Sequence, residues 1–232
     1  MVGTTMHRHG TFFPDRINQY VKAMRFAADL GDDGIYKLSF GAPAISDPNG
    51  IVAAFTITGG VTILPASFVG AVEPVVDSPW GRGLSLEGSA AGTPLVTVTG
   101  FDYLGQAMTE NITLVSVTET FGVKAFARVT KLVVATGITG TIDVGFSDVL
   151  GLPYKTTAII EELADGAIQS AGTQVDPVLT DPATAVTGDP RGTYNPTVVL
   201  DGLIDVAFSG RADNWINAAG NGGYYGIKHF AA

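Results

Sequence analysis

Apolar and polar residues alternate with a period of two along several short segments in the middle of the chain. Val96 to Thr99 alternates a branched apolar residue with a hydroxyl, and similar patterns return over residues 109–117, 125–134 and 140–144. Glycine or other turn-forming residues stand near the bends between these segments. Such alternation is typical of strands that bury one face of a sheet. The pattern predicts a mainly β protein, an antiparallel β sandwich or barrel of jelly-roll or immunoglobulin-like type.

Flanking segments extend this series of strands. Further strands are predicted at residues 35–40, 51–58, 61–64 and 156–163. The segment 51–58 is more continuously apolar than the others, which is typical of a central strand, and Gly59-Gly60 predicts a hairpin turn after it. Near the C-terminus, residues 197–209 alternate around Asp201-Gly202, which predicts a closing hairpin.

The chain divides on this basis into four parts. Residues 1–34 form an N-terminal arm, 35–164 the β domain, 165–196 a long Pro- and Asp-rich loop, and 197–232 the closing hairpin with an aromatic tail. Three Asp-Pro pairs in the loop predict extended or turn conformations, because a residue before proline disfavours helix. A loop of this length in a compact domain is usually functional or ordered by a partner.

The arm differs from the rest of the chain in carrying basic residues. Apolar residues at helical spacing predict a short helix after Pro14-Asp15: Ile17, Tyr20, Val21 and Met24. We predict that the arm docks on an acidic partner surface through the opposite side of this helix, which carries Arg16, Lys22 and Arg25, and Tyr20 is a further candidate contact. The alternative is a helix that closes one end of the β domain.

Aromatic residues supply the other candidate contacts. Trp80 and Arg82 lie in a segment that looks exposed, and both residue types are enriched at interaction hot spots. Trp80 could instead close the open end of the core. The Gly-rich tail adds Trp215, Tyr224, Tyr225 and Phe230, which we predict pack on a neighbouring subunit. Its alternative is a last strand that returns to the chain's own sheet.

Composition limits the kind of partner. Charged residues make up 15% of the chain, against about 25% in typical soluble domains. This favours a surface partly covered by neighbours in an assembly, although a surface rich in Thr, Ser and Gly gives the same figure. The net charge of −9 argues against nucleic acid as a partner, since phosphate binding needs clustered Lys and Arg. The chain has no cysteine, so disulfides and thiolate metal sites are excluded.

The sequence shows no arrangement of catalytic residues. Neither a Gly-x-Ser-x-Gly elbow, a phosphate-binding loop nor a His-Glu-x-x-His motif is present. Adjacent Glu161 and Glu162 would point to opposite faces of a strand, so they do not form a pair of catalytic acids. The aspartates of the Asp-Pro pairs lack the spacing of a Ca²⁺ loop. We therefore expect no enzyme activity, no cofactor and no bound metal.

Targeting signals are also missing from the sequence. The first ten residues lack the apolar region of a signal peptide, and no apolar run approaches the ~18 residues that span a bilayer. We expect synthesis in the cytoplasm and no membrane partner.

Three runs within residues 96–155 carry a resemblance: VTVTGFDYLGQAMTENIT, GVKAFARVTKL and VGFSDVLGLPY. They resemble structural proteins of tailed bacteriophages, especially capsid decoration (cement) proteins. The resemblance covers about 60 of the 232 residues and consists of strand and turn patterns. It implies a protein on the capsid exterior of the virion, with the major capsid protein as partner. It also implies contacts with copies of itself, in a homotrimer or another homo-oligomer.

Two other functions fit the same features. The chain could be a tail, head-fibre or adaptor component of the virion. It could also be a host-glycan-binding β module whose Trp80, Trp215, Tyr224 and Tyr225 stack on sugar rings.

Overall fold

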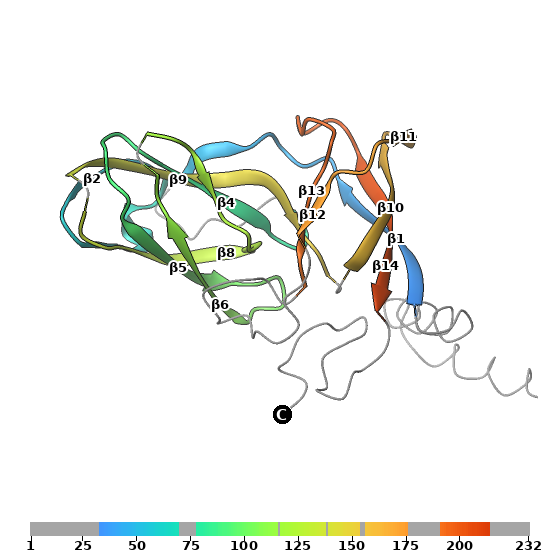
Figure 1. The fold of residues 1–232 in the computed structure, drawn as a ribbon, viewed down its shortest axis with the longest axis horizontal. Coiled ribbons are helices and arrows are strands. Elements are labelled where there is room, and N and C mark those ends of the chain that lie inside the picture. Colours follow the sequence, from blue (N-terminus) through green and yellow to red (C-terminus); the bar gives the residue numbers. More distant parts are fainter. Residues whose placement is uncertain are drawn as a thin grey trace, which may run out of the picture.

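A computed structural model describes residues 33–69, 78–115, 117–137, 139–153, 156–175 and 191–213, and Figure 1 shows their arrangement. These residues form strands β1 to β14 and one short 3-10 helix, Pro65–Ser67. The predicted mainly β fold with antiparallel sheets is confirmed. The predicted helix of the arm and the aromatic tail lie outside the described residues. Within the described ranges, no helix is long and apolar enough to cross a membrane.

Sheet C contains four strands in the order β3-β8-β5-β6. Its strands are β3 (Val61–Ile63), β8 (Arg128–Val134), β5 (Leu95–Phe101) and β6 (Ala107–Thr113). Burial alternates along β5, where Val96 and Val98 are buried and Thr97 and Thr99 are partly exposed. This is the predicted period of two, and it gives sheet C one apolar face and one polar face.

Sheet B contains six strands, with β12-β13-β9-β4-β7 in order and β2 paired to β9. Their bounds are β2 (Asp47–Thr58), β4 (Arg82–Gly88), β7 (Thr120–Phe121), β9 (Thr139–Gly151), β12 (Thr173–Val175) and β13 (Thr193–Asn195). The apolar faces of sheets B and C enclose the larger core, to which β2, β4, β5, β6, β8 and β9 all contribute. We call this sandwich the first lobe.

Sheet A forms the second lobe, on the right in Figure 1. Its order is β1-β14-β10-β11, with β1 (Asp33–Gly41), β14 (Val206–Asp213), β10 (Thr156–Ala164) and β11 (Ala167–Gln169). A second, aromatic-rich core lies between this sheet and the end of sheet B, and includes Phe40, Tyr194 and Phe208.

Strand β9 joins the two lobes. It is 13 residues long, although the alternation of the sequence predicted a strand only over residues 140–144. Its Ile142 and Val144 belong to the first core, whereas Leu150 belongs to the second. A single continuous strand therefore contributes to both cores, and this fixes the lobes to each other.

The predicted hairpin at Gly59-Gly60 is wrong. Strand β2 pairs with β9 in sheet B, whereas β3 pairs with β8 in sheet C. Gly59, with φ of 106°, turns the chain from one sheet of the sandwich to the other. Strand β2 is also not central, because β9 is its only pairing partner among the described strands. Its continuous apolar character instead reflects the residues that it places in the first core, Ile51, Val52 and Ile57.

Strand β2 bulges outward near its start. Its register with β9 shifts between Asp47 and Val52, so several residues of β2 lie opposite a short stretch of β9. The bulge packs directly on Gly145, where a Cβ atom would overlap the Asp47 carbonyl oxygen and the Pro48 backbone. Glycine is therefore required at this position by the close approach of another backbone segment.

The C-terminal part of the chain also differs from the prediction. The expected loop 165–196 contains β11, β12 and β13, and its residues 176–190 lie outside the described ranges. The expected hairpin over 197–209 is a loop followed by the single strand β14, which pairs with β1 and β10. The Asp201 carboxylate accepts hydrogen bonds from the backbone N–H groups of Leu203 and Ile204 at 2.8 and 2.9 Å. The Asp-Gly signal thus marks a turn inside a loop.

Candidate interaction surfaces

Most of the residues predicted to contact a partner lie outside the described ranges: Arg16, Tyr20, Lys22, Arg25, Trp215, Tyr224, Tyr225 and Phe230. Their roles stay predictions. The remaining two, Trp80 and Arg82, lie at the junction of the lobes, just before and at the start of β4.

Trp80 packs at the edge of the second core. Its side chain is partly buried, and its ring meets the Phe40 ring edge-on, with centroids 5.4 Å apart and an interplanar angle of 79°. The backbone beside it approaches β9 closely, since a Cβ at Gly151 would overlap the Trp80 carbonyl oxygen. This position agrees with the alternative that Trp80 closes an end of the core. An additional contact between its exposed part and a partner stays a prediction.

Arg82 is not on an exposed segment, as the sequence suggested, because only 2% of its surface is exposed. Its Nε donates to the Ser147 carbonyl oxygen at 3.0 Å, and Nη1 donates to the Ala44 carbonyl oxygen at 3.0 Å. Nη2 lies 3.4 Å from the Asp148 carboxylate. The planar guanidinium thus joins β4, β9 and the connection before β2, since it offers several donors in fixed directions. The contacts described for Arg82 lie within the chain, and a contact with a partner stays a prediction.

Glu162 and Tyr194 form a buried polar contact inside the second core. Both are fully buried, and the Tyr194 hydroxyl donates a hydrogen bond to Glu162 Oε2. Glu162 also accepts from the backbone N–H groups of Thr197 and Val198 at 3.0 to 3.1 Å. The Tyr194 oxygen accepts in turn from Gly172 N at 2.7 Å. The carboxylate therefore fixes β10, β13 and the loop after β13 in one arrangement.

The environment of Tyr194 keeps its phenol protonated. Burial raises the pKa of Tyr194 well above its usual value of 10.0, and the hydrogen bond to Glu162 raises it further. A protonated phenol can donate to the carboxylate throughout the physiological range.

The adjacent acids Glu161 and Glu162 serve different sites, as predicted. Glu162 points into the core, whereas Glu161 accepts a hydrogen bond from Ser209 Oγ at 3.0 Å.

A buried ion pair links the first lobe to the chain that leads into β13. Arg191 Nη1 lies 3.5 Å from Asp102 Oδ2, and both side chains are at most 1% exposed. The Arg191 guanidinium also lies over the Tyr103 ring, 4.9 Å from its centroid. Asp102 Oδ1 accepts from the backbone N–H groups of Leu104 and Gln106 at 2.9 and 2.8 Å. Asp102 thus shapes the β5–β6 turn and holds the segment before β13 at the same time.

Glu110, a buried acid on the inner face of β6, also holds a loop in place by accepting backbone hydrogen bonds. It is 2% exposed, and its Oε1 accepts from Val123 N at 2.6 Å and from Lys124 N at 3.3 Å. Thr193 Oγ1 of β13 donates to the Val123 carbonyl oxygen at 3.3 Å, which connects this loop to β13. The buried charged groups therefore position loops.

No group of three or more His, Cys, Asp or Glu residues in the described ranges is arranged to hold a metal ion.

Four exposed aliphatic side chains lie on neighbouring segments of the second lobe. We call Ile45, Ile168, Val199 and Leu203 the end patch; they are 59%, 71%, 70% and 82% exposed. Hydrogen bonds hold the segments that carry them together. Gly202 N donates to the Pro43 carbonyl oxygen, and Thr197 Oγ1 donates to the Ser170 carbonyl oxygen. In Figure 1, β11 and the loop between β13 and β14 lie at the same end of the lobe.

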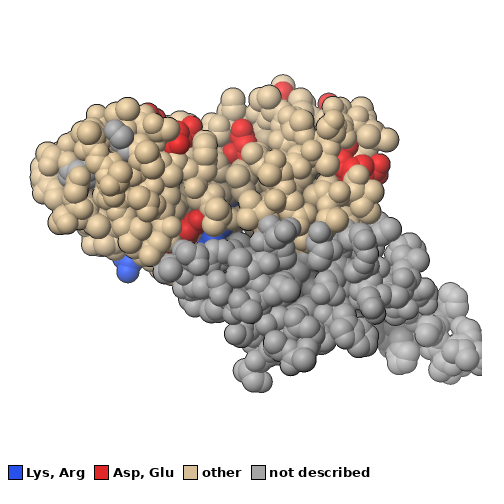
Figure 2. Space-filling view, viewed as in Figure 1, with Lys and Arg blue, Asp and Glu red and all other residues tan. Residues whose placement is uncertain are grey.

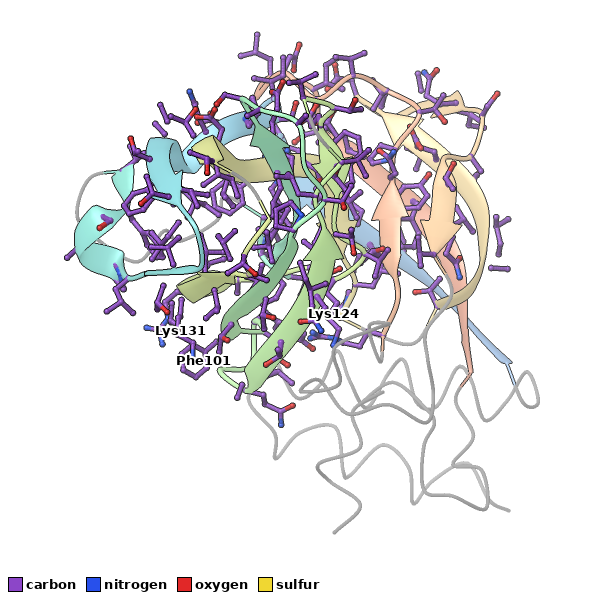
Figure 3. All side chains as sticks on the ribbon, turned by 60° about the vertical axis from the view of Figure 1, so that its left-hand side comes forward. Phe101, Lys124 and Lys131 are labelled. Atoms are coloured by element: carbon purple, nitrogen blue, oxygen red, sulfur yellow. The ribbon has the colours of Figure 1, made fainter. Side chains whose placement is uncertain are left out.

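A basic face lies on the opposite part of the molecule, on the outer side of sheet C. Arg128 and Lys131 of β8 lie on this side with Phe101 of β5, and the Arg128 guanidinium is 4.5 Å from the Phe101 ring centroid. Figure 3 shows Phe101 and Lys131 together at the lower edge of the first lobe, whereas Lys124 lies apart from them. In Figure 2 basic side chains are few, and carboxylates lie mainly over the upper side and the second lobe.

Neither the end patch nor the basic face could be identified from the sequence. Val199 and Leu203 stood in a predicted hairpin, where alternation would bury one of them. The side chains of Phe101, Arg128 and Lys131 share a face only because of the strand register, which the sequence does not show. Comparison with protein families, with curated proteins and with solved structures finds no match to this chain.

Proposed function

We propose that this chain is a structural component of a tailed-phage virion, a capsid decoration protein that binds the outside of the shell. The end patch carries the proposal. Three further features support it: the resemblance of residues 96–155 to phage decoration proteins, the 15% content of charged residues, and the antiparallel sandwich architecture. On this proposal the protein acts by binding, and its partners are the major capsid protein and copies of itself.

The end patch is suited to burial against another protein. Its four side chains are aliphatic, and the hydrogen bonds beneath them hold the loops in place before any partner binds. Burying one such side chain completely is worth about 1.5–3 kcal/mol. Preordered loops reduce the entropy lost on binding, which improves affinity. These aliphatic side chains, on segments already held in place by hydrogen bonds, are therefore the strongest candidates on the described surface for contact with the shell.

The position of such a contact would explain how the protein stabilises the shell. A decoration protein seated across a joint between capsomers adds buried surface that must be lost before the capsomers separate. Standard interfaces bury about 1,600 Å², and permanent assemblies bury more. The added association free energy opposes expansion of the shell by the packaged genome.

Substitutions in the end patch test the proposal. Val199→Ser and Leu203→Ser together should weaken binding to empty shells of the cognate phage at least tenfold, measured by cosedimentation over a range of protein concentrations. Leu64→Ser is the matched control, because Leu64 is 52% exposed but lies in the first lobe. It should bind as the wild type does. Equal binding by the double variant and the wild type would exclude the end patch as the contact.

A further inference from the structure

The bulge at the start of β2 contains an Asn-Gly pair, Asn49 and Gly50. The register with β9 shifts between Asp47 and Val52, and the pair lies inside this shift, away from the paired positions. Asn49 is exposed, and none of the described residues hydrogen-bonds to its side-chain amide. The fold therefore leaves this amide open to water and to reaction with its own backbone.

An asparagine that precedes glycine can lose its side-chain amide without an enzyme. The backbone nitrogen of the glycine attacks the asparagine Cγ, a C–N bond forms, and ammonia leaves with the proton that this nitrogen loses. The resulting succinimide ring takes up one water molecule and opens at either carbonyl group, which gives aspartate or isoaspartate. Glycine favours the attack because it has no Cβ to block the approach and its backbone is the least restricted. Water is the only co-reactant.

Asp47 places a carboxylate beside both residues of the pair. Its Oδ1 accepts a hydrogen bond from Asn49 N at 3.3 Å, which forms a local turn. Its Oδ2 lies 2.8 Å from the position that a Cβ of Gly50 would occupy, so a side chain there would force the carboxylate to move. The turn thus favours glycine at position 50. A carboxylate held beside the pair can also take the proton that the attacking nitrogen loses.

The products of this reaction would disturb the contact between the bulge and β9. The backbone of residues 47–49 fills the space that a side chain of Gly145 would need. Isoaspartate at position 49 adds one methylene group to the backbone at this contact. Either product also adds a negative charge close to Asp47, and like charges at short distance repel each other. Both effects weaken the packing of β2 on β9.

We propose that Asn49 is a site of spontaneous deamidation in the folded protein, with Gly50 N as the nucleophile and the Asp47 carboxylate as the proton acceptor. The reaction converts the chain with time into aspartate and isoaspartate forms whose β2 bulge is loosened. This modification concerns the first lobe. It does not depend on the end patch or on the proposed function.

Peptide mapping of the aged full-length protein by mass spectrometry tests the modification. The native chain and the chain unfolded in guanidinium chloride are incubated at the same mildly alkaline pH, and conversion at each asparagine is followed with time. Folding should not slow conversion at Asn49. Asn111 is the internal control, because it lies in the paired part of β6, its side-chain oxygen accepts from Thr97 Oγ1 at 2.8 Å, and the branched Ile112 follows it. In the native chain it should convert at least tenfold more slowly than Asn49.

A native rate at Asn49 below the rate in the unfolded chain would overturn the proposal, because it would show that the bulge protects the amide. Asp47→Asn tests the proton acceptor and adds no second reactive pair, since proline follows and has no N–H. It should slow conversion at Asn49 several-fold in the native chain but not in the unfolded one. An unchanged native rate would exclude Asp47 from this role.

Urea unfolding of fresh and aged protein tests the loosening of the bulge. Aged wild-type protein should unfold at a lower urea concentration than fresh protein. Asn49→Gln is the matched control, because its longer side chain keeps the amide but forms the ring with its backbone much more slowly. Fresh and aged samples of this variant should unfold alike. Equal losses of stability in aged wild type and aged Asn49→Gln would show that reaction at Asn49 does not loosen the bulge.

Discussion

Tyr194 donates its hydroxyl hydrogen to the carboxylate of Glu162 in the interior of the second lobe, where both residues are fully buried. A buried carboxylate is tolerated only when hydrogen bonds replace the water that it loses. Glu162 receives them from Tyr194 and from the backbone of Thr197 and Val198. The Tyr194 ring lies 5.0 Å from the Phe208 ring, so the same residue contributes to the aromatic core. This contact determines how the loop that carries Val199 and Leu203 is held.

Loss of the Tyr194 hydroxyl should destabilise the fold. Tyr194→Phe keeps the aromatic packing but removes one donor from a buried carboxylate, which should lower the free energy of unfolding by about 1–3 kcal/mol. Urea denaturation measures the change. Tyr103→Phe is the control, because its hydroxyl donates to the Pro153 carbonyl oxygen at 3.1 Å in a partly exposed position. An equal or larger effect of Tyr103→Phe would contradict the importance given to the Glu162 contact.

The stability of the wild type should fall at alkaline pH because of Tyr194. Its pKa is raised in the folded state, so above about pH 10 the unfolded chain loses the phenol proton while the folded chain keeps it. The unfolded state then binds fewer protons, and the free energy of unfolding decreases by up to about 1.4 kcal/mol per pH unit. The difference in stability between wild type and Tyr194→Phe should therefore shrink as pH rises above 10. A difference that stays constant from pH 8 to the alkaline limit would show that folding does not raise this pKa.

Replacement of Arg82 even by lysine should destabilise the fold. An ammonium group cannot reach the carbonyl oxygens of Ser147 and Ala44 and the Asp148 carboxylate together. We expect Arg82→Lys to lower the free energy of unfolding by about 2 kcal/mol. Lys37→Arg, an exchange of the two cations at an exposed position of β1, is the control and should stay within about 0.5 kcal/mol. Thermal or urea unfolding of both variants gives the comparison, and similar values would argue that Arg82 is not a structural link.

Gly145 should not tolerate a side chain. A Cβ atom there would overlap the backbone of the β2 bulge, which cannot move without breaking its pairing with β9. Gly145→Ala should therefore destabilise the protein by about 1–3 kcal/mol, the usual cost of overpacking. Gly60→Ala is the control, since its nearest neighbour would be the Thr136 methyl group at 3.4 Å, an ordinary contact. Full stability of Gly145→Ala would show that the bulge is not packed as described.

The fold class could be predicted because one physical rule determines most of it. A strand with one buried face must alternate, and β5 and β6 do so in both sequence and structure. The connections could not be predicted in the same way. Gly59-Gly60 permits a tight turn, but whether the chain returns beside β2 or crosses to sheet C depends on long-range pairing with β8. Strands β11, β12 and β13 were missed because each is only three residues long and lies in the stretch that the Asp-Pro pairs assigned to a loop.

The buried charges were harder to recognise, although one of them left a signal. Glu110 lies two residues from both Met108 and Ile112, so the alternation itself places a carboxylate on the inner face. Arg82, Asp102 and Arg191 gave no such signal, because their burial depends on residues far away in the sequence. The end patch was missed for a different reason. Apolar residues are normally assigned to a core, and only the loop conformation shows that Val199 and Leu203 are exposed.

Decoration of a phage shell by this chain is tested most directly by imaging empty cognate shells with and without the purified wild-type protein. Averaged images should show added density at regular positions on the outer surface, approaching full occupancy as the protein is added. Decorated shells should also withstand heating better than bare shells. Shells that show no added density at saturating protein concentration would contradict the decoration function.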